Sequence, residues 1–265
     1  MKFPILLPNI FNYPFTYESD LNLKAGDFVE VPFGKSKIIG VVWTEFEKEK
    51  NKNFKLKKII KKLEIPQLRK NTLNFLNWFA EYNIVPKGMA LKLVLLSGKP
   101  ITKFESEFYK NFNLSIKDNS FTLSEEQKKT LKEIKIANKG FNVHVLQGTT
   151  GSGKTLVYFE ALKQILNKGF QGLIMLPEIG LTNQFEKKFI EFFGIYPAIW
   201  HSGISKKKKE IIWSGLINGE IKVVIGARSA LFLPFKKLGL IIVDEEHDQS
   251  YKQDEGIIYN ARDMA

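Results

Sequence analysis

The sequence predicts a mixed α/β protein in which a small, mainly β domain precedes a parallel sheet covered by helices. From Phe121 onward, apolar runs of strand length alternate with segments of helical periodicity, which is typical of a parallel sheet with helices on both faces. Before that point, the β-rich runs 27–34 and 37–45 are separated by a short Gly-Lys-Ser link. This spacing indicates an antiparallel hairpin at the amino-terminal end.

The composition indicates a folded protein rather than a disordered one. Of the 265 residues, 44% are apolar and 22 are Phe, which is enough to build a core. No apolar run approaches the roughly 20 residues that cross a bilayer, and no secretory signal is recognisable, so we expect a cytoplasmic protein without a membrane partner. The sequence contains no Cys, which excludes disulfides and thiolate metal sites in this chain.

The net charge of +12 is compatible with a polyanionic partner such as nucleic acid. An excess of Lys over Arg beside abundant Ile and Asn is also what an AT-rich genome produces, so charge alone leaves both explanations open. The run 45–64 carries eight Lys against four Glu. We interpret it as a solvated face in preference to a strip that follows DNA, because most such runs are solvated.

Two helical segments follow the β-rich runs. Asn71 is predicted to cap a helix over TLNFLNWFAEYN. The segment Pro86-Lys-Gly88 then interrupts the pattern before a second helical run at 88–96. The residues expected to form the buried face of the first helix are Leu73, Leu76, Phe79 and Ala80.

Residues 97–120 are polar with weak periodicity, and we place the domain boundary there. The predicted parts are an amino-terminal domain at 1–98, a linker at 99–120 and a second domain at 121–265. Ser124 is expected to cap the first helix of the second domain. The predicted strands of that domain are 143–146, 172–177, 222–227 and 238–244, and its predicted helices include 182–193 and 205–219.

The segment GTTGSGKT at 148–155 matches the phosphate-loop pattern, in which successive backbone N–H groups wrap a triphosphate. The apolar run 141–146 before it is predicted to be a buried strand, and a helix from Thr155 aims its positive end at the phosphates. A chance match is the alternative, which this context disfavours. The residues expected to bind nucleotide phosphates are Gly148, Thr149, Thr150, Gly151, Ser152, Gly153, Lys154 and Thr155.

Strand 238–244 ends in the acidic segment Asp244-Glu245-Glu246-His247. Open α/β sheets place their ligands at the carboxyl ends of such strands. Beside a phosphate loop, Asp244 and the Thr155 hydroxyl can hold Mg²⁺, and Glu245 can accept a proton from the attacking water. Lys154 would neutralise the β- and γ-phosphates. The alternative interpretation is an exposed acidic turn.

The acidic segment resembles the Asp-Glu-x-His box of superfamily 2 helicases, and further helicase boxes occur in order. LSEEQ at 123–127 resembles the glutamine motif that reads adenine, which assigns that role to Gln127. PEIGLT at 177–182 and GARSA at 226–230 resemble the motifs that grip the nucleic-acid backbone. With HSGIS and VDEEHDQSYKQDEG, these boxes resemble the bacterial primosomal replication-restart helicases.

This resemblance implies a RecA-like first helicase lobe and an ATP-dependent 3′-to-5′ DNA helicase that assembles the primosome at stalled forks. The implied cofactors are ATP and Mg²⁺. The implied partners are forked and single-stranded DNA, primosome proteins and the single-stranded-DNA-binding protein. The implied catalytic residues are Lys154, Asp244, Glu245 and His247.

The resemblance also implies DNA contacts in the second domain. Thr182 and Arg228 suit contacts with the phosphates of single-stranded DNA, and His201 would line the same face. The segment 248–263 resembles an aromatic-rich loop that couples DNA binding to hydrolysis, in which Tyr251 and Lys252 would contact DNA. An ordinary surface loop is the alternative for that segment.

In the first domain, VPFGKSKIIGVV resembles a family motif that contains Gly34 and Lys35, and IFNYPF at 10–15 resembles the family's Phe-Asp-Tyr pocket. In the family this domain binds the 3′ end of the nascent leading strand. Phe11 and Tyr13 would flank the terminal base. Asn12 replaces the family's Asp and would accept a hydrogen bond from the 3′-hydroxyl through its amide oxygen, without the charge.

Two departures from the family lower the expected activity. The segment 99–120 is too short for the family's winged-helix domain. The second helicase lobe and the zinc-binding insert of the full-length family are not in this sequence, so no zinc ligands are expected here. We therefore expect an incomplete lobe that binds ATP and fork DNA, hydrolyses ATP poorly and does not unwind DNA alone.

Two further functions stay open at this point. The chain would otherwise be a non-catalytic fork-binding or primosome-scaffold fragment. Another phosphate-loop motor, such as a chromatin remodeller or a restriction subunit, is the third possibility. The segments VPFG and PEIGLT disfavour the last of these.

Overall fold

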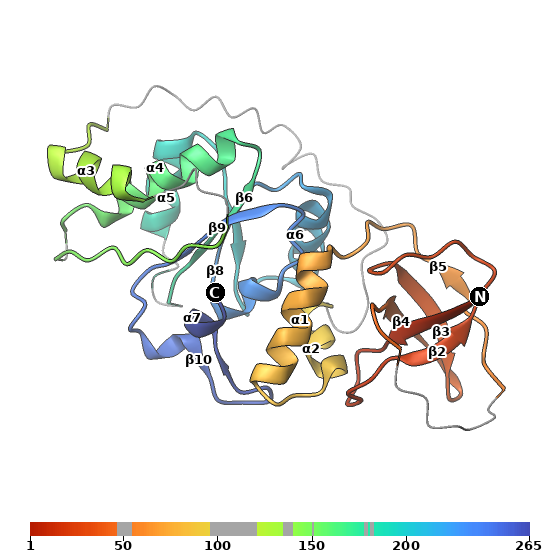
Figure 1. Ribbon diagram of the computed structural model, residues 1–265. Coiled ribbons are helices and arrows are strands. Elements are labelled where there is room, and N and C mark those ends of the chain that lie inside the picture. Colours follow the sequence, from red (N-terminus) through yellow and green to blue (C-terminus); the bar gives the residue numbers. More distant parts are fainter. Residues whose placement is uncertain (47–54, 96–120, 135–139, 150, 178–179, 181–182) are drawn as a thin grey trace.

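The computed structural model confirms a mixed α/β chain with two types of sheet (Figure 1). None of the described helices is long and apolar enough to cross a membrane. The structure describes all residues except 47–54, 96–120, 135–139, 150, 178–179 and 181–182.

The amino-terminal strands form one antiparallel sheet with the order β2-β1-β4-β3-β5. Strands β3 and β4 pair from Phe28 with Val41 to Phe33 with Ser36, which confirms the predicted hairpin. Its turn requires Gly34, whose φ of 59° lies in the left-handed region that glycine adopts without a steric penalty. The strands are β1 (Lys2–Leu6), β2 (Phe15–Glu18), β3 (Phe28–Phe33), β4 (Ser36–Val42) and β5 (Lys61–Lys62).

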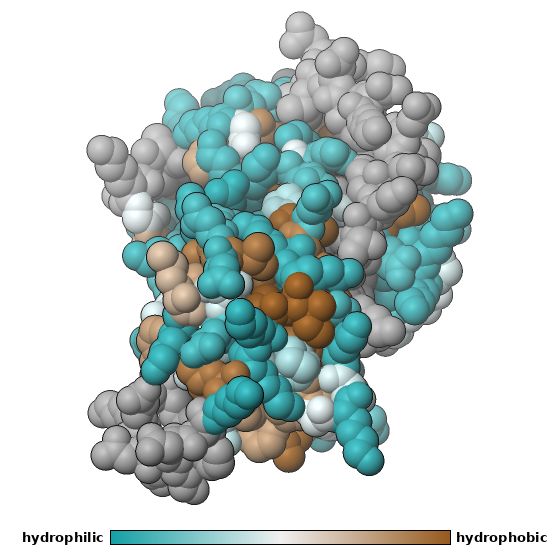
Figure 2. All heavy atoms as spheres, turned by 90° about the vertical axis from the view of Figure 1, so that its right-hand side faces the viewer, coloured by the Kyte–Doolittle hydropathy of each residue, from teal (hydrophilic) through white to brown (hydrophobic). Residues whose placement is uncertain are grey.

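The described part of the Lys-rich run forms ion pairs at the edge of this sheet. Lys62 donates to the buried Asp27 carboxylate at 2.7 Å, and Lys58 and Lys61 lie 3.7 and 4.0 Å from acidic side chains. Figure 2 views the molecule from the right-hand side of Figure 1 and shows mainly hydrophilic side chains with separate apolar patches. The ion pairs of Lys58, Lys61 and Lys62 favour the interpretation of the Lys-rich run as a solvated face.

Two helices follow, α1 (Lys70–Tyr82) and α2 (Lys87–Val94). The predicted cap at Asn71 is wrong. The backbone N–H of Leu73 bonds to the carbonyl of Arg69, so Arg69 occupies the N-cap position and Asn71 lies inside the first turn. The predicted buried face is confirmed, because its four members are the buried residues of α1: Leu73, Leu76, Phe79 and Ala80.

The second sheet is parallel and has the order β7-β8-β6-β9, with the fully buried β6 as one of its two inner strands. Its strands are β6 (Gln171–Met175), β7 (Ala198–Trp200), β8 (Val223–Gly226) and β9 (Leu238–Val243). The helices are α3 (Glu125–Glu133), α4 (Lys154–Asn167), α5 (Asn183–Phe193) and α6 (Lys206–Asn218). Shorter elements complete the chain: η4 (Arg228–Phe232), η5 (Gln249–Tyr251), β10 (Lys252–Gln253), β11 (Tyr259–Asn260) and α7 (Ala261–Met264).

The predicted strand before the phosphate loop is wrong. Residues 141–149 have no regular secondary structure, and Phe141, Val143 and Val145 are 83%, 74% and 87% exposed. Among the described residues the sheet ends at β9, which pairs only with β6 and is itself half-buried. A strand needs a neighbour for its backbone groups, and this segment has none in the described part of the chain.

The two sheets share one hydrophobic core through α1 and α2, which lie between them in Figure 1. The ring of Phe28 in β3 packs edge-on against Trp213 in α6, with centroids 5.9 Å apart. The indole N–H of Trp213 donates to the carbonyl of Val94 in α2 at 2.8 Å, in a buried position. Trp213 therefore fastens the amino-terminal sheet, α2 and the parallel sheet to one another. The predicted linker lies outside the described residues.

We predict that Trp213→Phe destabilises the whole chain by about 1–3 kcal/mol, because it leaves the buried Val94 carbonyl without its donor. Unfolding in urea, followed by circular dichroism, measures this loss. Trp78→Phe is the matched control, because Trp78 is 43% exposed and a change there should stay within about 0.5 kcal/mol. Equal midpoints for the two variants would contradict the fastening role of Trp213.

Candidate nucleotide and DNA sites

The phosphate loop leads directly into α4. Gly151 and Gly153 have φ values of 82° and 81°, which only glycine adopts readily. Gly153 is the N-cap of α4, so the positive end of this helix faces the loop. The backbone N–H of Ser152 closes a turn onto the carbonyl of Thr149 at 3.2 Å. The loop thus has the shape of an anion cradle, and Thr150 lies outside the described residues.

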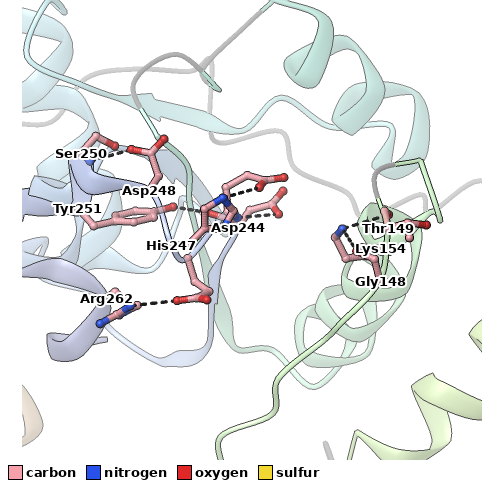
Figure 3. Close-up of polar contacts among 11 residues, drawn as sticks. Gly148, Thr149, Lys154, Asp244, His247, Asp248, Ser250, Tyr251 and Arg262 are labelled. Carbon is pink, nitrogen blue, oxygen red and sulfur yellow. Dashed lines mark hydrogen bonds and ion pairs between the residues drawn. The ribbon is translucent and has the colours of Figure 1, made fainter.

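The ammonium of Lys154 lies over this loop. Its Nζ donates to the carbonyl oxygens of Gly148 at 2.7 Å and Thr149 at 3.3 Å (Figure 3). The Lys154 ammonium is thus hydrogen-bonded to two carbonyl oxygens. The same ammonium can donate to phosphate oxygens instead. Charge-assisted bonds to phosphate are stronger than bonds to neutral carbonyls, so an incoming triphosphate can compete for the ammonium.

Gln127 braces the loop from α3. Its Oε1 accepts from the backbone N–H of Ser124, whose hydroxyl accepts from the N–H of Gln127, and this reciprocal capping box confirms the predicted cap. Its Nε2 donates to the carbonyl of Ser152 at 3.1 Å. A Cβ on Gly153 would overlap the same Nε2, so a larger residue there would displace the Gln127 side chain from the loop. The adenine contact of Gln127 stays a prediction.

The carboxyl end of β9 presents Asp244. Its backbone N–H bonds to the carbonyl of Met175, which continues the pairing with β6. Its Oδ2 accepts from the hydroxyl of Tyr158 at 2.8 Å and its Oδ1 from the backbone N–H of Glu245 at 3.1 Å. The Tyr251 hydroxyl donates to the backbone carbonyl of Asp244 at 2.6 Å. Both carboxylate oxygens and the main chain are thereby held in place.

Glu245 has a φ of 47°, a left-handed conformation that is uncommon for a residue other than glycine. Such conformations concentrate at functional sites. Its carboxylate lies 3.7 Å from Nε2 of His247, and both side chains are more than half exposed. Glu246 instead pairs with Arg262 at 3.1 Å. The acidic segment is thus an exposed turn at the sheet edge with one fixed carboxylate, Asp244.

Figure 3 shows Lys154 on one side and Asp244 on the other, without a direct contact between them. The link between the two groups is Tyr158, which lies on α4 one turn after Lys154 and Thr155. Burial raises the pKa of Tyr158, as does the Asp244 charge, while a hydrogen bond with the Thr155 side chain lowers it. A hydroxyl and a carboxylate are hard oxygen donors, which suits Mg²⁺ completed by phosphate oxygens and water.

No group of three or more His, Cys, Asp or Glu that could hold a metal occurs among the described residues. Mg²⁺ commonly binds through one or two protein ligands plus substrate phosphates, and Thr155 with Asp244 fits that arrangement.

Two of the predicted DNA contacts of the second domain, Tyr251 and Arg228, form hydrogen bonds within the protein. Tyr251 is only 1% exposed, and its hydroxyl is used by the carbonyls of Asp244 and Met175, so its ring is not available for base stacking. Arg228 donates to the carbonyls of Ser250 and Lys252 at 3.1 and 2.8 Å and thus braces the segment after β9.

The remaining predicted contacts of this domain stay predictions. Lys252 is exposed and pairs with Asp254 at 3.0 Å. Nδ1 of His201 accepts from the backbone N–H of Gly203 at 3.2 Å. Thr182 lies outside the described residues.

In the first domain, Phe11 and Tyr13 belong to a cluster of half-buried rings, with centroids 5.6 Å apart. The Oδ1 of Asn12 already accepts a hydrogen bond from the backbone N–H of Lys87 at 3.0 Å, and a second bond from a 3′-hydroxyl stays a prediction. Asn12 also lines a surface hollow of about 420 Å³ at the turn between α1 and α2. The hollow includes Ile84, which has a φ of 54° and is 92% exposed. Gly34 and Lys35 lie exposed at the β3–β4 turn.

Tyr158 and Ile84 are the site residues that the sequence did not single out. Tyr158 occupies a position of the apolar face of α4, where a core role is the usual expectation. Ile84 carries no signal at all, because a positive φ at a β-branched residue cannot be read from sequence.

We predict that Gln127→Glu loosens the phosphate loop without unwinding α3. Glutamate retains an acceptor for the N–H of Ser124 but has no donor for the carbonyl of Ser152, a loss of about 1 kcal/mol. Hydrogen exchange measured by mass spectrometry should show faster exchange at 151–153 and unchanged protection at 128–133. Gln127→Ala, which removes both bonds, should weaken protection in both segments. Unchanged loop exchange in the Glu variant would refute the brace.

Comparisons with known proteins agree with this arrangement. The family model described as "3'DNA-binding domain (3'BD)" matches residues 4–96, and the model for DEAD/DEAH box helicases matches residues 124–265. Replication restart protein PriA of Rickettsia conorii is 43% identical over 98% of this chain and 40% of its own length. The PriA proteins of Haemophilus influenzae and Bacillus subtilis are 42% and 41% identical over 56% and 54% of the chain.

In those two relatives the match covers 20% and 18% of their length. The chain spans about two fifths of the length of the Rickettsia protein that it matches. The predicted resemblance to primosomal helicases and the predicted fold are confirmed. The chain belongs to the DEAD/DEAH box helicase family, and it joins the helicase domain to a 3′ DNA-binding domain as replication restart protein PriA does.

Proposed function

We propose that this chain binds ATP with Mg²⁺ and forked DNA as part of an ATP-dependent 3′-to-5′ helicase of replication restart. The observation that carries the proposal is the Tyr158 bridge, which brings the phosphate-loop helix and the carboxyl end of β9 together at one edge of the sheet. The family membership supports the use of ATP and Mg²⁺.

Each residue of this edge has a proposed task. The glycine turn and the amino-terminal end of α4 hold the phosphates, and Lys154 adds its positive charge. Thr155 and Asp244 hold Mg²⁺, which neutralises charge on the phosphate oxygens. Glu245 accepts the proton of the attacking water, and His247 lies close enough to influence that carboxylate.

The amino-terminal domain is proposed to bind the 3′ end of a nascent strand at a fork. The ring cluster around Phe11 and Tyr13 offers stacking surfaces for a terminal base, and the hollow beside Asn12 offers space for its sugar. The neighbouring parts of the domain are basic at Lys35 and Lys87. Primosome proteins and the single-stranded-DNA-binding protein are proposed partners by the same family relationship.

The arginines of the chain favour slow hydrolysis. The sequence has three: Arg69, Arg228 and Arg262. Arg228 donates to backbone carbonyls, Arg262 pairs with carboxylates, and Arg69 is the N-cap residue of α1. An arginine that contacts the transferred phosphate typically contributes roughly 10³–10⁵ in rate.

A second function, a fork-binding scaffold, is favoured by the exposed segment 141–145, which leaves the phosphate loop without a sheet partner among the described residues.

We predict that the chain binds the fluorescent analogue mant-ATP with Mg²⁺ and that Lys154→Ala weakens this binding roughly tenfold to a hundredfold. The reason is the loss of a charge-assisted contact of about 1.5–3 kcal/mol. Hydrolysis by the same wild-type preparation should stay slow when DNA is added, and no strand separation should be detected. Rapid DNA-stimulated turnover would rule out the proposed slow hydrolysis.

We predict that the chain prefers a fork with a free 3′ end over the same fork with a blocked end, as measured by fluorescence anisotropy. Tyr13→Ala should weaken binding to the free-end fork by about 1–3 kcal/mol, the value of one stacked base. Tyr82→Ala is the control, because Tyr82 is an exposed aromatic residue outside the ring cluster. Equal affinities for both forks would count against a 3′-end site.

A further inference from the structure

The hydroxyl of Tyr158 lies between two elements that the fold brings together from distant parts of the chain. Tyr158 belongs to α4, and the carboxylate that accepts its hydrogen bond follows β9, 86 residues later. The side chain is 7% exposed, in a cluster with Phe159, Leu162 and Ile174. A buried hydroxyl bound to a carboxylate at 2.8 Å is held firmly, because neither group can turn to water without losing its partner.

The other proposed ligand of Mg²⁺ lies on the same helix as Tyr158. Thr155 is one helical turn before Tyr158, close enough for its side chain to lower the pKa of the tyrosine hydroxyl. Tyr158 therefore lies beside one proposed ligand, Thr155, and is bonded to the other, Asp244. The carboxylate of Asp244 is fixed at its second oxygen by the backbone N–H of Glu245.

We propose that Tyr158 is a positioning residue for Mg²⁺, which sets the orientation of the Asp244 carboxylate. The inference rests on the proposed binding of ATP with Mg²⁺. Groups that hydrogen-bond to metal ligands fix the ligands' orientation, and their loss typically lowers metal affinity by roughly tenfold to a hundredfold. Tyr158 thus acts on the metal through Asp244 and touches neither the nucleotide nor the reacting water.

A purely structural role for Tyr158 makes a different prediction, and Tyr251 supplies the comparison. Its hydroxyl also reaches Asp244, but at the backbone carbonyl, and its single hydrogen is shared between that carbonyl and the carbonyl of Met175. Removal of this hydroxyl disturbs the main chain at the end of β9 without releasing the carboxylate. Comparing variants of the two tyrosines therefore distinguishes an effect on the orientation of the Asp244 carboxylate from an effect on the stability of β9.

The test compares Tyr158→Phe with Tyr251→Phe in mant-ATP binding titrated with Mg²⁺, and again in EDTA. Phenylalanine keeps the ring and its packing, and thermal unfolding of each variant reports its stability. For Tyr158→Phe we expect the Mg²⁺ concentration for half-maximal binding to rise roughly tenfold to a hundredfold, with the metal-free affinity unchanged. For Tyr251→Phe we expect a lower unfolding temperature and an unchanged Mg²⁺ requirement.

Two results would overturn the inference while leaving the proposed function intact. One is wild-type Mg²⁺ dependence in the Tyr158 variant. The other is an Mg²⁺ requirement that rises in both variants in proportion to their loss of stability. A wild-type chain that binds no mant-ATP at any Mg²⁺ concentration would instead overturn the proposed function and the inference together.

Discussion

The hydrogen bond between Tyr158 and Asp244 is the contact on which the candidate nucleotide site depends. The phosphate loop has no anchoring strand before it, because residues 141–149 lie outside the sheet. The loop is therefore held in place by two attachments. One is α4, into which the loop continues, and the other is the hydrogen bond from Gln127 of α3. Of these two attachments only α4 reaches the acidic end of β9, and it does so through Tyr158.

The amino-terminal domain packs, through α1, against the elements that surround the acidic turn after β9. Phe79 of α1 contacts Phe232 of η4 and Tyr259 of β11, with ring centroids 5.0 and 5.6 Å apart. Arg228 begins η4 and holds the carbonyls around Tyr251, whose hydroxyl supports Asp244. The contacts are thus continuous from the hollow beside Asn12, which α1 lines, to the acidic turn. This continuous packing joins the region proposed for DNA binding to the region proposed for nucleotide binding.

The sequence predicted the elements whose stability is local or whose burial pattern is strong. The buried face of α1, the hairpin of β3 and β4, the N-cap of α3 at Ser124 and the strands β6, β8 and β9 all follow from periodicity and capping chemistry. The predicted strand at 141–146 is wrong because apolar residues form a strand only where a neighbouring strand is present to pair with it. Tertiary context thus overrode a local preference.

Side-chain partners were the least predictable part of the site. An aromatic residue in a basic segment suggests stacking on a base, but Tyr251 is buried and donates to backbone carbonyls. The amide of Asn12 suggested a free acceptor, whereas the fold places it over the first turn of α2. Tyr158 looked like a core residue. Each of the three side chains has a partner 75 or more residues away in the chain, a separation that no local pattern encodes.

The central claim is that the phosphate loop and the carboxyl end of β9 form one site for a nucleotide with Mg²⁺. Hydrogen exchange of the wild-type chain, with and without the slowly hydrolysed analogue ATPγS and Mg²⁺, tests it most directly. We expect ligand-dependent protection in two separate segments, 148–158 and 240–251. Protection confined to the loop segment, with 240–251 unchanged, would contradict the claim.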